Sequence, residues 1–464
     1  MRDAVSPEQK AIFNRGNNVG VLAQQLFPGG TDATPTKRSD NIAAVEKTKQ
    51  LINSGVEIIY EAAFQHNQVL AILDILVKKD NQWYAYEVKS SAKISHTYLL
   101  DASLQYWVIT QSGIALEDIS IININNQYIK HDSIELNKLF SITSVKNEAL
   151  KNQELIAEKI EASKLVSANP QMPNVAIGEH CFSPYACDFM GTCWRNVPQN
   201  SVFEISGVQK AELFNLYHNG YKTVREIPET NNLDKNANIH IQSVKKAEIK
   251  VDREAIQRFL SSISYPLFFM DFETFMPAVP LYNNTKPYQN IPFQYSLHYK
   301  KSKDSTIEHF EFLAEQGIDP RKHFIENLLQ HTQAEGTIFA FDSLMERNIL
   351  KGLKKDFPEF STQIDSRLNR IVDLMQPFQE RSYYHPAMKN SHSIKNILHA
   401  LVPDLNYSTL QISSGSIAMI AFEKLQTETD LFKIIQTREE LIEYCKLDTL
   451  AMVKIFEILE KQVE

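Results

Sequence analysis

The sequence lacks any run of about 18 apolar residues, and its first residues contain no apolar segment of the kind that a secretion signal requires. We therefore expect no membrane partner and a cytoplasmic location. It also lacks internal repeats and low-complexity tracts. With 464 residues, 43% of them hydrophobic, the chain is long enough for two or three globular domains that each bury a core of their own.

An excess of basic residues is also missing. The 48 Lys and Arg residues are outnumbered by 56 Asp and Glu residues, which gives a formal net charge of -8. This balance argues against a protein that binds nucleic acid through a broad basic surface. It does not exclude a metal-dependent nuclease, because clustered acids that bind Mg²⁺ raise the negative count while local Lys and Arg can still line a groove.

Cysteine is scarce, and the four residues present are too few for a disulfide framework in a chain of this length. Cys181, Cys187 and Cys193 have the spacing Cys-x5-Cys-x5-Cys, with proline and aromatic residues between them. This spacing suits thiolates folded round zinc or an iron-sulfur cluster. The alternative is three buried free thiols, since cysteine also behaves as a small apolar residue.

The chain does contain an apolar stretch interrupted by acids, at residues 267–274, which predicts a central strand. Side chains two apart in a strand point to the same face, so Asp271 and Glu273 project together. Burial of two unpaired acids is costly, and such a pair normally holds a cation or a basic partner. The alternative is an exposed strand end with two solvated acids. We expect Phe268, Phe272 and Phe275 to be core residues rather than platforms for bases.

Further acids follow at two places. Thr437-Arg438-Glu439-Glu440 has the pattern of a capping box, which predicts a helix that starts there and places Tyr444 and Asp448, four residues apart, on one face. Residues 336–341 predict another strand, and Glu346 lies in the helix expected after it.

These acids and the tyrosine together resemble the tyrosine-bearing subgroup of the DEDD 3′-5′ exonucleases over residues 256–464. The resemblance implies a ribonuclease H-like fold with a mixed sheet, metal ligation by Asp271, Glu273 and Asp448, and a Tyr444 that orients the attacking water. The second family motif is usually Asn-x-x-Phe-Asp, so Glu346 stands where an aspartate is usual. Asp373 is either a further acid near the site or a helix cap.

The chemistry of phosphodiester hydrolysis explains a need for four acids. Two divalent ions about 4 Å apart activate water and neutralise the charge on the attacking and leaving oxygens. Mg²⁺ and Mn²⁺ are suited to carboxylate and water ligands. We therefore expect Mg²⁺ or Mn²⁺ as the cofactor.

A second acidic pattern occurs nearer the N-terminus, where residues 69–77 and 83–89 predict two strands joined by a polar turn. Asp74 and Glu87 could hold a metal ion there, and Lys89 shares a face with Glu87 and could position or polarise water. The alternative is a cross-strand surface ion pair.

Asp74, Glu87-Val88-Lys89 and Gln105 on the following helix resemble the PD-(D/E)XK nucleases of the RecB type, which implies a restriction-endonuclease-like fold. Glu61 would take the first acidic position of that family. The chain departs from the pattern where an early His is usual, since residues 15–20 offer no metal-binding side chain, and where Ile109 replaces a tyrosine. RecB-like proteins with a cluster place one cysteine before the nuclease core, and this chain has only the three after it, so the ligand set for a 4Fe-4S cluster or Zn²⁺ is incomplete unless His180 contributes.

The expected organisation is an α/β protein of three parts: a RecB-like domain with the cysteine segment at 1–200, a helical connector resembling a helix-hairpin-helix at 201–255, and an exonuclease domain at 256–464. This combination resembles a family of uncharacterised bacterial proteins whose C-terminal half is known only as a domain of unknown function. It implies a nuclease that acts on single-stranded DNA, or alternatively RNA, in repair, processing or defence. The rival hypothesis is an inactive nucleic-acid-binding adaptor that keeps the folds. His392 or Lys395, at the start of a helix, could meet a phosphate, and the alternative is a histidine in a surface loop with no such role.

Overall fold

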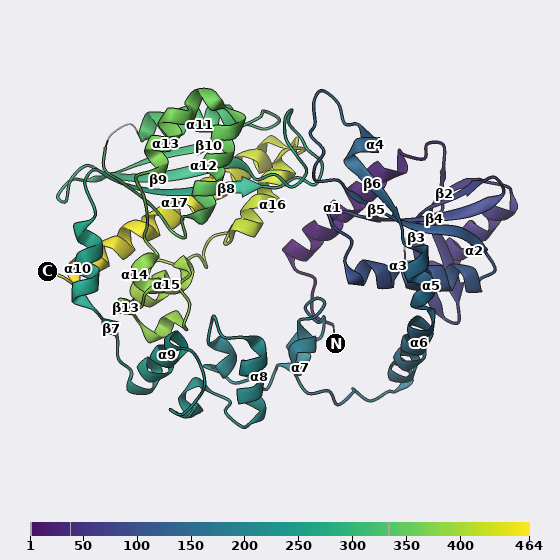
Figure 1. The fold of residues 1–464 in the computed structure, drawn as a ribbon, viewed down its shortest axis with the longest axis horizontal. Coiled ribbons are helices and arrows are strands. Elements are labelled where there is room, and N and C mark those ends of the chain that lie inside the picture. The colour runs from purple at the N-terminus through teal and green to yellow at the C-terminus, as the bar shows by residue number, and fades with distance from the viewer. Residues whose placement is uncertain (1, 38, 333–334) are drawn as a thin grey trace. The chain divides into compact units, whose positions relative to one another are not determined.

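The computed structural model describes residues 2–37, 39–332 and 335–464, and the chain divides into two compact units (Figure 1). The C-terminal unit comprises residues 1–4, 176–276 and 290–464, and the N-terminal unit comprises residues 5–175 and 277–289. Each unit contains a mixed sheet with helices, so the expected α/β class is confirmed. Within the described residues, no helix is both long enough and apolar enough to cross a membrane.

The C-terminal unit is organised round a five-stranded sheet in the order β10-β9-β8-β11-β12. The central strand is β8, which is antiparallel to β9 and parallel to β11. The bounds are β8 Leu267–Phe275, β9 Ile291–Lys300, β10 Ile307–Leu313, β11 Thr337–Ala340 and β12 Ile371–Asp373. The strand predicted at 267–274 is therefore confirmed, and neighbours pair with it on both sides.

Alternation along β8 sends successive side chains into two different cores. Phe269 packs on the face covered by α17 (Leu431–Lys461), whereas Phe268 and Phe272 pack on the face covered by α11 (Arg321–His331), α12 (Leu344–Asp356) and α13 (Ser361–Leu368). Figure 1 shows these helices on opposite sides of the sheet. Phe268, Phe272 and Phe275 are buried, which confirms their expected core role.

Helix α17 begins seven residues before the start that its capping pattern predicted, since its N-cap is residue 430 rather than 437. Asp430 is the N-cap, and its carboxylate accepts from the backbone N–H of Phe432 at 3.0 Å. Thr437 lies inside the helix, where the backbone N–H groups are already bonded to carbonyls one turn earlier and need no cap. The predicted start was wrong, but the shared face of Tyr444 and Asp448 is unaffected.

The rest of the C-terminal unit is built from short elements. The connector, residues 201–255, has a small core of its own that includes Val202, Leu213 and Ile241. Aromatic contacts join the connector to the cysteine segment, where the ring centroids of Trp194 and Phe203 lie 4.8 Å apart.

The α-helices not yet named are α7 Met190–Cys193, α8 Lys210–His218, α9 Lys235–Lys246, α10 Arg253–Ser261, α14 Gln376–Gln379, α15 Ile394–Leu401 and α16 Gly415–Leu425. The 3-10 turns are η1 Glu179–Cys181, η2 Val202–Glu204, η3 Val224–Glu226, η4 Pro358–Phe360 and η5 Pro386–Met388, and β7 Lys250–Val251 pairs with β13 Tyr383–Tyr384.

The N-terminal unit has a six-stranded sheet in which spatial order follows chain order, β1 to β6. The strands are β1 Thr31–Asp32, β2 Ile58–His66, β3 Val69–Lys79, β4 Gln82–Lys89, β5 Leu116–Ile124 and β6 Phe140–Ser144. The helices are α1 Pro7–Gln24, α2 Asn41–Asn53, α3 His96–Gln111, α4 Leu136–Leu139, α5 Lys146–Lys151 and α6 Gln153–Ala168. The hairpin predicted at residues 69–89 is confirmed as β3 and β4.

Candidate metal centre

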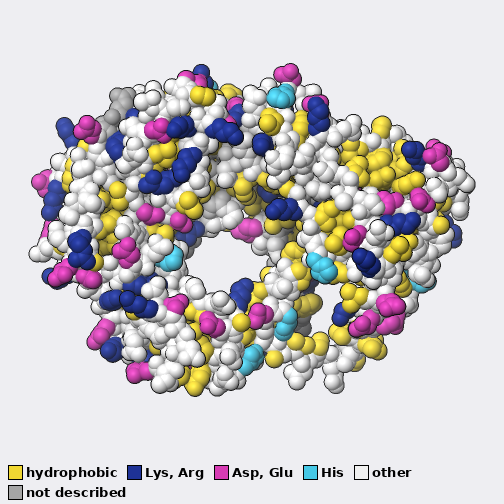
Figure 2. All heavy atoms as spheres, viewed as in Figure 1, with side chains coloured by type: hydrophobic (Ala, Val, Ile, Leu, Met, Phe, Trp, Pro, Cys, Tyr) yellow, Lys and Arg dark blue, Asp and Glu magenta, His cyan; other side chains and the backbone are white. Residues whose placement is uncertain are grey.

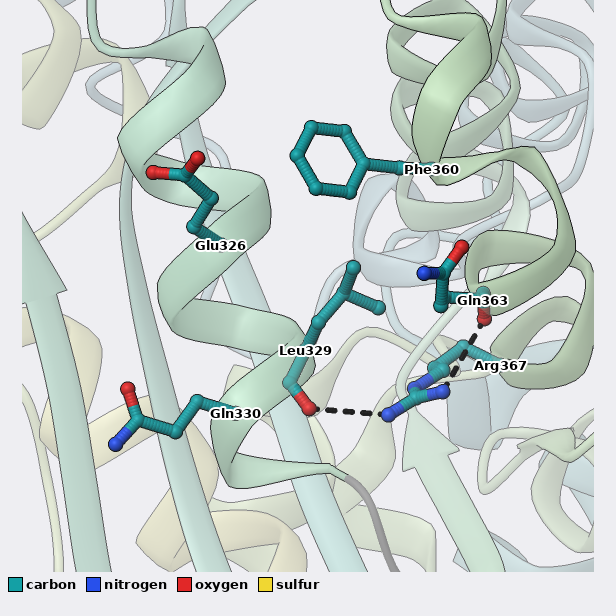
Figure 3. Close-up of a pocket in the computed structure, with 6 residues that line it drawn as sticks. All are labelled: Glu326, Leu329, Gln330, Phe360, Gln363 and Arg367. Carbon is teal, nitrogen blue, oxygen red and sulfur yellow. Dashed lines mark hydrogen bonds between the residues drawn. The ribbon is translucent and has the colours of Figure 1, made fainter.

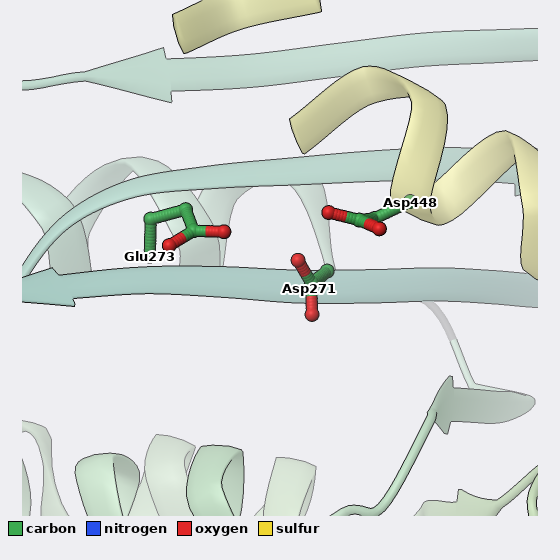
Figure 4. Close-up of side chains that lie close together, drawn as sticks. All are labelled: Asp271, Glu273 and Asp448. Carbon is green, nitrogen blue, oxygen red and sulfur yellow. The ribbon is translucent and has the colours of Figure 1, made fainter. Parts of the chain in front are cut away.

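The predicted acids on β8 and α17 converge. Carboxylate oxygens of Asp271, Glu273 and Asp448 all lie within 4.8 Å of one another (Figure 4). Glu273 and Asp448 are each 6% exposed, and Asp271 is half-buried. Asp448 thus joins two acids that precede it by 175 and 177 positions in a single carboxylate cluster on the α17 face of the sheet.

Local geometry explains why these side chains meet. Asp271 and Glu273 point to the same face as Phe269, because all three occupy alternate positions of β8. Phe456 of α17 packs against Phe269 with ring centroids 5.7 Å apart, which fixes the helix over that face two turns beyond Asp448. Apolar contacts therefore hold the third acid against the strand pair.

Glu346 lies in the first turn of α12 and is 3% exposed. Its Oε2 atom has no hydrogen-bond partner within the described part of the chain, and its charge contributes to raising the pKa values of Asp271 and Glu273. It is outside the group whose ligand atoms lie within 4.8 Å of one another. The predicted fourth acid is thus close enough for its charge to act on the others, and one of its two carboxylate oxygens is buried without a partner among the described residues.

Asp373 braces the backbone that precedes α12, and its charge also helps to raise the pKa of Glu346. Its carboxylate accepts from the backbone N–H groups of Asp342 at 3.1 Å and Ser343 at 2.9 Å. Asp373 is not itself an N-cap, since the N-caps of α12 and α14 are Ser343 and Met375. By holding the backbone just before α12, Asp373 also helps to position Glu346.

The electrostatics of the cluster favour a bound cation. Burial and then the neighbouring acids raise the pKa of Asp271 well above its usual range. Burial chiefly raises the pKa of Glu273 to about 8 and that of Asp448 to about 6. Burial likewise raises the pKa of Glu346 to about 8. Divalent ions would favour the charged forms of all four carboxylates, so the donor set and the unpartnered Glu346 oxygen fit Mg²⁺ or Mn²⁺.

Two tyrosines flank Asp448. Tyr444, one turn earlier on α17, is 4% exposed, and its phenol opposes the rise in the pKa of the Asp448 carboxyl. Tyr407, in the segment between α15 and α16, donates its hydroxyl to Asp448 Oδ1 at 2.6 Å. Sequence reasoning found Tyr444 from its spacing but missed Tyr407, because the segment that carries Tyr407 has no periodic pattern.

The N-terminal unit brings its predicted residues together as well. Gln105 of α3 donates to Glu87 Oε2 at 2.8 Å, and Lys89 Nζ lies 2.8 Å from Glu87 Oε1. Asp74 accepts from the backbone N–H of Val88 at 2.6 Å. Gln105 therefore contacts a predicted metal ligand, and its role in supporting the site stays a prediction. Gln105 Oε1 is buried without a hydrogen-bond partner within the described residues.

The acids of this second cluster are also perturbed. Burial first, and then the charge of Asp74, raises the pKa of Glu87 to about 8. Burial raises the pKa of Asp74 to about 6, and Glu61 adds to that rise. Glu61 has φ of 55°, in the left-handed region, where strand pairing between Tyr60 and Ala62 is interrupted.

Lys89 is held by two acids rather than one. Its Nζ atom lies 2.5 Å from Asp101 Oδ2 in addition to its contact with Glu87. Burial lowers its pKa, but the charges of these two acids outweigh burial, so the pKa of Lys89 is raised overall. Sequence reasoning missed Asp101, which occurs one turn before Gln105 on α3.

The three cysteines of the predicted cluster are free thiols, with Cys181 buried and Cys187 and Cys193 exposed. Over the ranges that the structure describes, no three ligand atoms of this segment, His180 included, come within 4.8 Å of one another. The backbone does fold back on itself here, since Cys187 N–H donates to Cys181 O at 2.8 Å. A zinc or iron-sulfur centre stays a prediction.

The surface adds two observations. Basic and acidic side chains are interspersed over both units on the face that Figure 2 shows. A pocket on the C-terminal unit lies away from the acid cluster, and Arg367 there donates to Leu329 O at 3.0 Å (Figure 3). Its lining residues are Glu326, Leu329, Gln330, Phe360, Gln363 and Arg367. None of them is among the predicted site residues.

Comparison with known proteins gives one match. A family model described as a domain of unknown function, DUF2779, matches residues 268–393. No curated protein and no solved structure matches the chain. The matched segment includes Asp271, Glu273 and Glu346 but ends before Tyr444 and Asp448, and its description assigns no activity.

Proposed function

We propose that this protein is a metal-dependent nuclease, and that its C-terminal unit is a ribonuclease H-like domain acting as a 3′-5′ exonuclease of the tyrosine-bearing DEDD type. The observation that carries the proposal is the convergence of Asp271, Glu273 and Asp448 within 4.8 Å. Two further observations support it: Glu346 Oε2 is buried without a partner among the described residues, and the phenol of Tyr444 helps to lower the pKa of Asp448.

The proposed ligands are the four carboxylates, with Mg²⁺ or Mn²⁺ as the ions. Bound ions would activate water and neutralise charge on the oxygens of the scissile phosphate. Tyr444 holds its proton, because burial raises the pKa of its phenol, and a neutral phenol can orient water by a hydrogen bond. The fixed β8 strand keeps two ligands at a set spacing, so the chain itself contributes preorganisation.

A second centre is proposed in the N-terminal unit, with the PD-(D/E)XK fold. Asp74 and Glu87 would hold an ion, Glu61 would add charge beside Asp74, and Lys89 would offset charge that develops on the phosphate. The hydrogen bond from Gln105 to Glu87 supports this assignment.

The proposed substrate is single-stranded DNA, with RNA as the alternative, in the cytoplasm. Carboxylate-bound ions that engage only the phosphate would let the enzyme act irrespective of sequence. The net charge of -8 means that attraction to the strand has to come from bound ions and a few local cations.

The test is cleavage of end-labelled single-stranded DNA and RNA by the full chain in Mn²⁺, with Asp271→Ala and Lys89→Ala in parallel. Laddering from the 3′ end that is lost only in Asp271→Ala supports the exonuclease. Internal cuts that are lost only in Lys89→Ala support the second centre. Binding without cleavage, in the native chain and both variants alike, would instead support the inactive adaptor.

A further inference from the structure

We propose that Lys395 binds a phosphate oxygen of the substrate strand at the edge of the carboxylate cluster, which makes it a substrate-contacting residue outside the four acids and Tyr444. This inference rests on the proposed nuclease function and deepens it. Lys395 lies on α15 in a part of the chain that contributes no acid to the cluster.

The position of the ammonium group is well defined. Nζ lies 5.0 Å from the ring centroid of Tyr407 and 5.6 Å from that of Tyr444, and it donates to Ser413 O at 2.5 Å. Tyr407 and Tyr444 are the two tyrosines that flank Asp448. Two aromatic rings and a backbone carbonyl therefore hold a positive charge beside the cluster.

The contacts of the Lys395 ammonium group differ from those of Lys89, which forms ion pairs with acids. Lys89 in the N-terminal unit makes ion pairs of 2.8 Å with Glu87 and 2.5 Å with Asp101. Lys395, by contrast, has no carboxylate oxygen within 4.0 Å of Nζ in the described part of the chain, although its charge acts on Glu273 and Asp448. It is kept near the acids without being paired to them.

Its hydrogen-bonding capacity is also incompletely used. An ammonium group has three N–H donors, and Ser413 O accepts one of them. The other donors can meet an anion that approaches the ions bound by the acids. A phosphodiester oxygen fits this requirement, because the same approach places its phosphate against the metal ligands.

The experiment measures binding of a fluorescein-labelled oligothymidylate to the full chain in Ca²⁺, over a range of salt concentrations. The variants are Lys395→Gln and Lys395→Arg, and Lys461→Gln is the matched control, since Lys461 lies roughly 20 Å further along α17 than Asp448. We expect Lys395→Gln to bind roughly tenfold more weakly. Its plot of log affinity against log salt should be shallower by about 0.7, the contribution of one phosphate contact. Lys395→Arg should keep the native slope, as should Lys461→Gln.

Three outcomes would overturn the proposal: an unchanged affinity and slope in Lys395→Gln, the same reduced slope in Lys395→Arg, or no binding by the native chain. Thermal unfolding of each variant separates a folding defect from a binding defect, and Lys395→Arg keeps the test valid if Lys395→Gln does not fold. Failure of the nuclease function has a different signature. In that case the native chain shows the lysine-dependent slope but leaves the strand intact in Mn²⁺.

Discussion

Asp448 is the residue on which the cluster depends most directly, because it joins α17 to the strand acids, accepts a hydrogen bond from Tyr407 and lies one turn after Tyr444, whose phenol also lowers its pKa. A carboxylate that receives such bonds keeps its charge more easily, so these phenols oppose the effect of burial. The tyrosines thus prepare Asp448 to bind a cation at a lower pH than burial alone would permit.

Substitution Tyr407→Phe tests this role. Loss of the 2.6 Å hydrogen bond should raise the pKa of Asp448 above its present value of about 6, and the acidic limb of the pH–rate profile should move to higher pH. We expect the rate in Mn²⁺ near pH 6 to fall roughly tenfold, with partial recovery near pH 8. Tyr383→Phe is the control, because Tyr383 is buried outside the cluster. An equal loss at both pH values would contradict the account.

Substitution of Gly336 and of Gly352 by alanine should change the free energy of unfolding in opposite directions. Gly336 has φ of 108°, and a Cβ atom there would lie 2.1 Å from Pro266 O, so Gly336→Ala should destabilise the C-terminal unit by at least about 2 kcal/mol. Gly352 lies in α12, and a Cβ atom there would meet nothing within 4 Å, so Gly352→Ala should stabilise by about 0.5–1 kcal/mol. Denaturant unfolding measures both, and destabilisation in Gly352→Ala would be inconsistent with the described packing.

At the scale of elements, the packing of α17 on β8 brings like charges together in the absence of metal. The pKa values of Glu273 and Glu346 are raised to about 8, so these groups hold protons in the folded state at pH values where they are ionised in the unfolded chain. Their contribution is fully present below the unfolded pKa, about 4.3, and is lost as pH rises through about 8.

We therefore expect the metal-free protein to lose stability between pH 7 and about pH 8, to lose no more from these two groups at higher pH, and to lose less when Mn²⁺ is bound. The buried histidines His298 and His309 do not interfere in this range, because burial lowers their pKa values to about 3 and about 4 and they are neutral in both states. Chemical denaturation with and without Mn²⁺ measures the effect. If Asp448→Asn showed the same pH dependence and the same response to Mn²⁺ as the native protein, the cluster would not be its source.

Local sequence patterns predicted the presence of individual helices and strands better than they predicted where an element starts or which side chains it contacts. Alternation on β8 and the four-residue spacing of Tyr444 and Asp448 are properties of single elements, so the sequence alone was sufficient for them. The start of α17 was mispredicted, because a capping pattern at Thr437 lies inside a longer helix whose cap is Asp430. Tyr407 could not be found this way, since its contact with Asp448 depends on how an irregular segment folds back.

At the scale of the whole molecule, each unit contains its own acidic cluster, and every contact described for a cluster lies within one unit. We expect the two to act independently: Lys89→Ala should leave the rate of 3′-end laddering within about twofold of native, since substitutions at sites that share no partner usually have additive effects. Single-turnover cleavage of a 5′-labelled strand measures that rate. A much larger loss would mean that the N-terminal cluster takes part in the exonuclease reaction.

The central claim is that acids from β8 and α17 form a site for divalent ions, and anomalous X-ray diffraction from crystals of the full chain soaked in Mn²⁺ tests it most directly. The account predicts an anomalous peak between the carboxylates of Asp271, Glu273 and Asp448, and its loss in Asp271→Asn crystals. Mn²⁺ peaks elsewhere in the molecule, with none among these three carboxylates, would contradict it.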